Sequence, residues 1–185
     1  MSTALSASKL KAIEAIAIVF RRVGYSAASM QMLSESTNLG KSSLYHHFPD
    51  GKQEMALAVL HWVEDLLQRE LMQPLFVSPE KRQQSVDAFL KKLLEYYQGG
   101  RLGCLLGVLS FQDCPQTVSD EVARVMRVWI QLFEDYLKVY QIKDAKDKAA
   151  HAVRAIQGGL ILSVSTQEED YFSNALKDVH AILLE

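Results

Sequence analysis

Apolar residues recur along the chain at steps of three and four residues, which is the spacing of one face of an α-helix. No segment alternates apolar and polar residues between turn signals, as a half-buried β-strand would. The pattern therefore predicts an all-α protein. The expected helices cover residues 8–23, 29–36, 40–47, 52–71, 80–98, 102–111, 119–140, 144–166 and 170–184.

The residues between these segments indicate where the helices end. Gly24 is expected to stop the first helix, and Ser29 is a good N-cap for the second. The turn before the third helix is residues 37–39, in which Asn38 can adopt the left-handed conformation. The third helix should end at residues 49–51, Pro-Asp-Gly, and the other three prolines also fall between predicted helices.

The second and third segments have the spacing of a helix-turn-helix. Two short helices joined by a three-residue turn can place the second helix in a DNA major groove. The apolar side chains expected to fix the pair are Leu33, Leu39, Leu44 and Phe48. Lys41, Ser42, Tyr45 and His46 should then lie on the opposite face of the third helix, one turn apart in pairs.

That outward face carries groups that bind DNA. A lysine pairs with a phosphate or donates to guanine, and serine, tyrosine and histidine bond phosphates or base edges. Glycine at the helix start lets the backbone approach the duplex, and the backbone N–H groups at a helix N-terminus favour a phosphate. The candidate DNA contacts are Ser29, Gly40, Lys41, Ser42, Ser43, Tyr45, His46 and Lys52.

Residues 10–60 resemble the N-terminal domain of the TetR family of transcriptional repressors. The resemblance rests on Gly24-Tyr25, on Ser29, on Lys52 and above all on the stretch at 39–48, Leu-Gly-Lys-Ser-Ser-Leu-Tyr-His-His-Phe. Three positions depart from the family pattern, where Ala, Gly and Ser are usual; they are Ser34, Asn38 and Gly40.

The resemblance implies a DNA-binding domain at residues 1–52 and an all-helical domain at residues 53–185 that binds an inducer and dimerises. Its last two helices usually form the dimer interface in this family. Two apolar stripes supply the candidates, which are Val153, Ile156, Gly159, Leu160, Phe172, Leu176, Val179 and Leu183. A repressor that reads a palindrome needs a two-fold partner, which favours a homodimer. The alternative is that both stripes are buried within their own chain.

An inducer site should lie among the middle helices. The candidates are Trp62, Leu66, Tyr97, Cys104, Leu105, Phe111, Trp129 and Phe133. Aromatic residues at helical spacing also form ordinary cores, so the alternative for each is a packing role. Cys104 is expected at the start of a short helix and close to Arg101, which would favour a reactive thiolate. Its Gly-Cys-Leu segment, with Cys114 ten residues on, also resembles TetR-type regulators that respond to electrophiles or oxidants. The alternative is a small buried core residue.

Charge and composition narrow the class of protein further. The net charge is −2; the first 60 residues carry six basic and four acidic side chains, whereas the remainder carries 14 and 18. A mildly basic head on an acidic body is compatible with a small phosphate-contacting surface. With two cysteines, no signal-like start and no long uncharged apolar run, we expect a soluble cytoplasmic protein without a membrane span.

The sequence is compatible with three functional classes. We favour a repressor that binds double-stranded DNA at a palindromic operator and is released by a small-molecule inducer or by thiol modification. An enzyme is not expected, because the sequence contains no phosphate-binding loop, carboxylate pair or catalytic triad. No cofactor is expected, and the dispersed His61, His151 and His180 predict no metal site. The third hypothesis is a helical interaction module that does not bind DNA.

Overall fold

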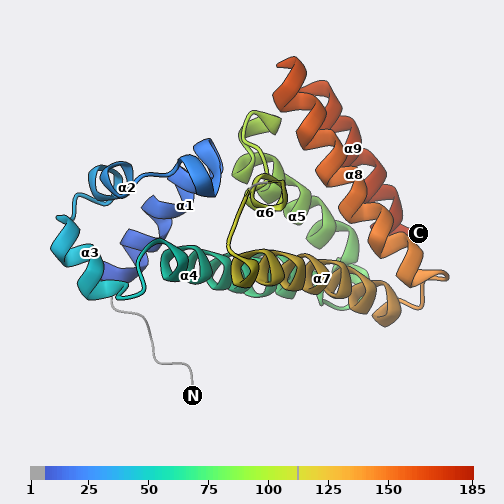
Figure 1. Ribbon diagram of the computed structural model, residues 1–185. Helices are drawn as coiled ribbons and strands as arrows, with labels where there is room; N and C mark the ends of the chain where they lie inside the picture. The colour runs from blue at the N-terminus through green and yellow to red at the C-terminus, as the bar shows by residue number, and fades with distance from the viewer. Residues whose placement is uncertain (1–6, 112) are drawn as a thin grey trace. The chain divides into compact units, whose positions relative to one another are not determined.

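Figure 1 shows the computed structural model, in which residues 7–111 and 113–185 are described. Every regular element in these residues is helical, so the all-α prediction is confirmed. Packing divides the chain into two units. We call residues 1–63 and 105–125 the head unit, and residues 64–104 and 126–185 the body unit.

The head unit contains the predicted helix-turn-helix. Its elements are α1 (Ala7–Ala27), α2 (Met30–Thr37), α3 (Lys41–His47), most of α4 (Lys52–Asp65), α6 (Leu105–Ser110) and the start of α7 (Gln116–Val139). Gly24 breaks the geometry of α1 as expected, with φ 76°, but a further helical turn follows it. Because a positive φ is costly for residues with a Cβ, glycine suits this kink.

The head core is built from three sets of apolar side chains. Ile16 and Phe20 of α1, and Leu33 of α2, are fully buried. Leu44 and Phe48 close the core beneath α3, as the sequence predicts. The first half of α4 also belongs to this core, because Met55, Ala56, Val59 and Leu60 have no exposed surface. The packing boundary therefore lies beyond residue 52, and α6 joins the head by packing on α1.

The body unit is a set of packed helices joined by short helical turns. Its elements are η1 (Leu66–Met72), η2 (Gln73–Leu75), η3 (Pro79–Lys81), α5 (Arg82–Tyr96), η4 (Gln98–Gly100), the rest of α7, α8 (Ala145–Thr166) and α9 (Asp170–Leu184). The segment expected to complete a helix at 52–71 is helical, but η1 is a π-helix. The last two helices match their predicted bounds within one residue.

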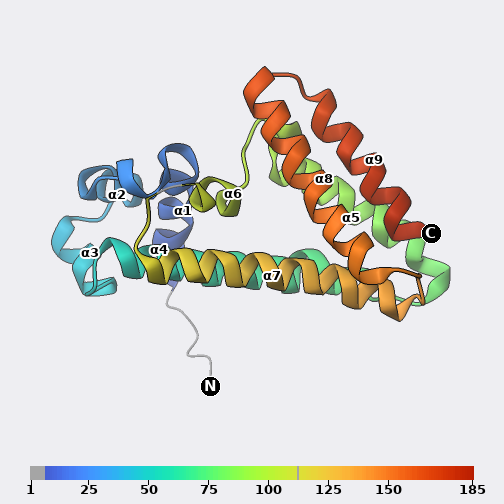
Figure 2. The same cartoon turned by 45° about the vertical axis from the view of Figure 1, so that its right-hand side comes forward.

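Helices α8 and α9 lie side by side as a hairpin (Figure 2). A small residue allows this approach, since a Cβ built on Gly159 would lie 2.6 Å from the Cβ of Ala175. The buried hydroxyl of Ser163 on α8 accepts a hydrogen bond from the Phe172 backbone N–H at 2.9 Å. One helix thus caps the first turn of the next, because that N–H has no partner within α9.

The opposite end of α9 is held by a polar cluster. The guanidinium of Arg82 donates to the Leu183 carbonyl at 2.5 Å and to the Tyr136 hydroxyl at 3.1 Å. Tyr136 donates to the same carbonyl at 3.0 Å. Two donors from α5 and α7 therefore satisfy a carbonyl at the end of α9 that has no partner within its own helix.

Two of the predicted helices have different bounds in the structure. The helix expected at 102–111 is α6, six residues long, so Cys104 precedes the helix instead of starting it. The helix expected from residue 119 begins at Gln116, directly after Pro115, which can precede a helix because its fixed φ already suits one. Across the described residues, no helix is both long and apolar enough to cross a bilayer.

We predict that Gly159→Ala lowers the free energy of unfolding by about 1–3 kcal/mol, because the added methyl group overpacks the contact between α8 and α9. Its neighbour provides the matched control: a Cβ at Gly158 meets nothing within 4 Å in the chain. Gly158→Ala should be neutral or stabilising by up to about 1 kcal/mol. Urea unfolding followed by circular dichroism measures both, and equal effects would contradict the packing argument.

Candidate nucleic-acid interface

The outer face of α3 presents five polar or aromatic side chains to solvent. Lys41, Ser42, Ser43, Tyr45 and His46 are all exposed. Between and behind them, Leu44 and Phe48 are fully buried and fix the helix to the head core. Figure 1 shows α3 following α2 after a sharp turn. The arrangement predicted from spacing is therefore present: one anchored helix with a continuous hydrogen-bonding face.

The turn before α3 is held by side-chain hydrogen bonds. Asn38 has φ 53° and ψ 27°, the left-handed conformation expected from the sequence. The Ser34 hydroxyl donates to the Leu39 carbonyl at 2.6 Å, and the Thr37 hydroxyl donates to the Leu33 carbonyl at 2.8 Å. Ser34, a departure from the family pattern, thus adds a bond across the turn that alanine could not make.

Gly40 is the N-cap of α3 and makes no side-chain cap. Its backbone is extended, with φ −62° and ψ 155°, and a Cβ there would meet nothing within 4 Å. The first N–H groups of α3 therefore have no capping side chain. In a helix of this kind they are donors available to a phosphate oxygen, together with the positive end of the helix dipole.

Ser29 caps α2, as expected. Its hydroxyl oxygen accepts a hydrogen bond from the Met32 N–H at 3.2 Å. The hydroxyl proton is not used by this cap, so the exposed side chain can still donate to a phosphate. Ser29 therefore combines a structural role with a free donor at the start of α2.

The side chain of Lys52 is engaged inside the head unit. Its ammonium donates to the carbonyls of Tyr25 at 3.0 Å, Ala28 at 3.1 Å and Ser26 at 3.5 Å. It also lies 4.5 Å from the centre of the Tyr25 ring. An ammonium with three such partners is not a free phosphate ligand. Only the backbone at the start of α4 remains available for the phosphate role expected of this position.

The connection from α6 to α7 is hydrogen-bonded to the same part of the head, which the sequence did not indicate. The Ser26 hydroxyl donates to the Asp113 carbonyl at 2.7 Å, and the Gln53 amide donates to the Thr117 hydroxyl at 2.8 Å. These four residues are polar and common on surfaces, and their partners lie far along the chain. No local pattern could have identified them.

One turn further along α7, Glu121 connects two helices. Its carboxylate accepts two hydrogen bonds from Arg124 and lies 3.1 Å from the His61 ring on α4. The hydrogen bond from Arg124 is the main cause that lowers the pKa of Glu121, and His61 contributes in the same direction. His61 therefore has a carboxylate partner, and the described residues contain no group of histidine, cysteine and acidic side chains that could hold a metal.

The inducer candidates are divided between the two units. Trp62, Leu105 and Phe111 belong to the head unit, whereas the other five belong to the body unit. Phe111 is 82% exposed and lines no interior. Trp129 and Phe133 are core residues, packed on each other and, through Phe133, on Phe89. Their burial favours the packing alternative for Trp129 and Phe133.

The remaining candidates are also taken up by packing or lie at helix surfaces. Tyr97 is buried with its ring against Phe172, and Leu105 is buried within α6. Trp62 and Leu66 are half-buried. Two hollows in the body unit, at residues 90–94 with 173–180 and at residues 68–76 with 132, are lined by none of the eight candidates.

The two cysteines have different surroundings. Cys104 is buried, 7% exposed, and the Gln157 amide donates to its sulfur at 3.2 Å. Arg101, expected to influence this thiol, forms an ion pair with Glu169 at 2.6 Å. Burial is the main cause that raises the pKa of the Cys114 thiol, Asp113 adds to the effect, and Lys52 opposes it. Cys114 is therefore held as a thiol, which is the less reactive form.

The predicted dimer contacts are buried within one chain. Ile156, Phe172, Val179 and Leu183 have no exposed surface, and the other four candidates have almost none. Within one chain they hold α8 and α9 to each other, so little of their surface is left for a partner. The outer face of α8 instead carries large exposed apolar side chains, at Ile161, Leu162 and Val164. A periodicity argument alone could not distinguish the two faces, since both are apolar.

Comparison with known proteins agrees with this geometry. Residues 12–59, which span α1 to the first half of α4, match the family model described as bacterial regulatory proteins, tetR family. The HTH-type transcriptional regulator LmrA of Bacillus subtilis is 23% identical over 168 residues, covering 86% of this chain and 88% of LmrA. The HTH-type transcriptional repressor DhaR of a Mycobacterium species is 29% identical over 121 residues, covering 63% of this chain and 58% of DhaR.

The fold comparison extends over nearly the whole chain. The crystal structure of a TetR transcriptional regulator from Legionella pneumophila superposes with a TM-score of 0.82 at 18% identity, covering 97% of this chain and 98% of that chain. Residues 12–59 thus match the model of the tetR family of bacterial regulatory proteins, regulators are similar over most of the chain, and the whole chain shares the fold of a solved TetR regulator.

Proposed function

We propose that the protein is a homodimeric repressor that binds a palindromic DNA operator and releases it when a small molecule binds the body unit. The observation that carries the proposal is the exposed face of α3 on a helix anchored by Leu44 and Phe48. The name of DhaR as a repressor supports the direction of regulation.

On this proposal, α3 lies in the major groove. Lys41 and the two serines after it contact phosphates or base edges, and Tyr45 and His46 contact sugar, phosphate or a thymine methyl group. Gly40 and Ser29 add donors at the starts of α3 and α2. Two such heads read half-sites about 34–36 Å apart, one turn of DNA.

Lys41 and Lys52 have different expected roles: Lys41 contacts DNA, whereas Lys52 stabilises the fold of the head unit. Lys41→Ala should weaken operator binding roughly tenfold and reduce the magnitude of the salt slope by about 1, since one phosphate contact is lost. Its effect on the free energy of unfolding should stay within about 0.5 kcal/mol, because the side chain is exposed.

Lys52→Met should instead lower the free energy of unfolding by about 1.5–3 kcal/mol, because it leaves the carbonyls of Tyr25 and Ala28 without their charged donor. Fluorescence anisotropy across a salt series and urea unfolding measure both variants. A Lys41→Ala protein with unchanged operator affinity would refute the placement of α3 and favour a helical module that does not bind DNA.

The exposed face of α8 supplies the proposed dimer contact. Ile161 is 53% and Leu162 47% exposed. Large exposed apolar side chains gathered on one helix indicate an interaction surface. A two-fold axis would bring the same face of α8 together from each protomer.

Ile161→Glu is therefore expected to convert the dimer into a monomer, because it places two carboxylates at the centre of an apolar contact. Val139→Glu, another exposed apolar position in the body unit, is the matched control and should leave the mass unchanged. Sedimentation equilibrium measures the mass of each, and a dimer that survives Ile161→Glu would place the interface elsewhere.

Release of DNA follows from a population shift between two states of the dimer. Helices α4 and α7 each continue from one unit into the other along the chain, so both can couple the body unit to the head. An inducer acts only as far as it binds the DNA-incompetent state more tightly than the competent one. Equal affinity for both states would leave operator binding unchanged.

Thiol modification is a second trigger, favoured by the Gln157 amide that points its donor at the Cys104 sulfur. The Cys104 sulfur adds to the double bond of N-ethylmaleimide, and the displaced thiol proton ends on the neighbouring ring carbon. Alkylation should lower operator affinity in the native protein and in Cys114→Ser, but not in Cys104→Ser. Unmodified Cys104→Ser should bind DNA normally. Equal sensitivity of all three proteins would exclude Cys104 as the trigger.

A further inference from the structure

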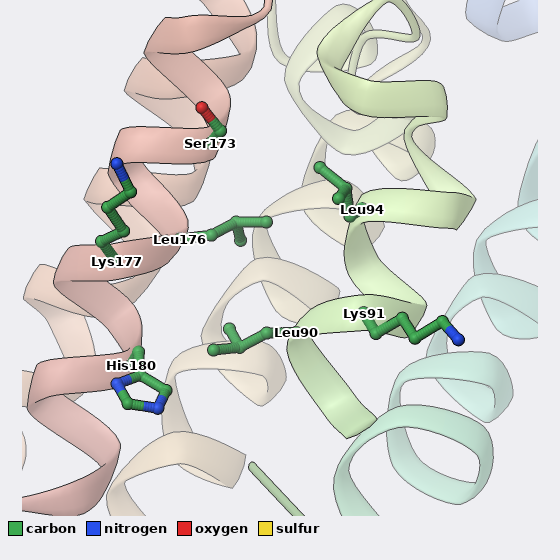
Figure 3. A pocket seen from close by; sticks show the side chains of 7 residues that line it. All are labelled: Leu90, Lys91, Leu94, Ser173, Leu176, Lys177 and His180. Carbon is green, nitrogen blue, oxygen red and sulfur yellow. The ribbon is translucent and has the colours of Figure 1, made fainter. Parts of the chain in front are cut away.

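An open groove of about 440 Å³ lies between α5 and α9 in the body unit. Its floor is formed by Leu90 and Leu94 of α5 and by Leu176 of α9, which project toward one another across the space between the helices (Figure 3). Ligand sites commonly have volumes of about 300–1,000 Å³, apolar linings and a few polar groups. The groove fits this description, although none of its residues was singled out as an inducer contact.

The rim on α9 carries a cation with spare hydrogen-bonding capacity. The ammonium of Lys177 donates to the Asn174 side-chain oxygen at 3.0 Å and forms no ion pair with any described residue. An ammonium has three donors, so two remain for an anion. Ser173, one turn before it, has a small side chain that leaves this end of the groove open.

The other charged groups around the groove are occupied. Lys91 contributes its stem to the lining, but its ammonium points away from the floor (Figure 3) and lies 3.9 Å from Glu95. At the opposite end, His180 lies 3.1 Å from the Asp87 carboxylate. The Lys177 ammonium also lies to the side of the three leucines in Figure 3, on the outer side of α9, so an anion would meet it at the rim of the groove with its apolar part along the leucines.

We propose that this groove binds an amphipathic carboxylate with a flexible apolar body, and that this ligand class is the effector. Binding of the carboxylate does not depend on the proposed repressor function, whereas the effector role rests on it. An apolar floor without the cation would take any hydrophobic molecule. Lys177 selects for an anionic head, because a carboxylate accepts charge-assisted hydrogen bonds that an alcohol cannot match.

Isothermal titration of the full-length protein with decanoate tests the binding step, with decanol as the uncharged probe of equal chain length. Lys177→Met keeps the stem and removes the charge; it should weaken decanoate binding about threefold to fivefold, as expected for an exposed ion pair, and leave decanol binding unchanged. Lys146→Met, an exposed lysine on α8, is the matched control and should bind like the native protein.

Ser173→Trp should fill the groove and weaken both probes at least about tenfold, while circular dichroism shows that the helices are retained. Decanoate binding that is the same in Lys177→Met, Ser173→Trp and native protein would overturn the site. Equal loss of both probes in Lys177→Met would overturn the selection for an anion.

Anisotropy on DNA from upstream of the protein's own gene tests the effector role. Decanoate should weaken operator binding by the native protein and not by Ser173→Trp. Decanoate that occupies the groove without changing operator affinity would overturn the effector role. Absence of specific DNA binding before any ligand is added would instead refute the repressor function, and the titration would still decide whether the groove binds carboxylates.

Discussion

In the head unit, a single ammonium group ties the start of α4 to the connection between α1 and α2. Lys52, the first residue of α4, donates to backbone carbonyls at the end of α1 and just before α2. These carbonyls lie where the chain leaves one helix and enters the next, so they lack the regular partners that a helix interior provides. One side chain thus fixes the start of α4 relative to both ends of the α1–α2 connection. The angle at which α3 is presented depends on that frame, because α3 is held between α2 and α4.

Much of the fold followed from periodicity, since helices bury one face and the spacing of apolar residues records it. The head was predicted in detail: the turn at Asn38, the buried Leu44 and Phe48 and the exposed face of α3 all agree with the structure. The role of Lys52 was not predictable, because a lysine at a helix start is compatible with a phosphate contact and with an internal one. Only the positions of the Tyr25 and Ala28 carbonyls distinguish them.

The body unit exposes the limit of the same reasoning. Apolar spacing identified α8 and α9 but could not tell which apolar face meets the chain's own core, and Ile156 and Phe172 proved to be inside. Apolar spacing is equally silent on whether an aromatic residue lines a ligand site or the core, and Trp129 and Phe133 lie in the core. Leu90, Leu94 and Leu176 line the open groove, and which residues of α5 and α9 face each other across it is a tertiary property without a local signal.

The two faces of α8 have a consequence for how related regulators stay distinct. Gly159 and Ser163 on the inner face are tied to Ala175 and Phe172, so substitutions there disturb the folding of the chain itself. Ile161 and Leu162 on the outer face are about half exposed and are not buried in the core of the chain. Substitutions on that face leave the chain's own packing intact, and in the proposed dimer a new apolar or charge pattern would exclude older copies by mismatch. On that proposal, two such proteins would cease to form mixed dimers after a gene duplication while each keeps the same fold and the same head.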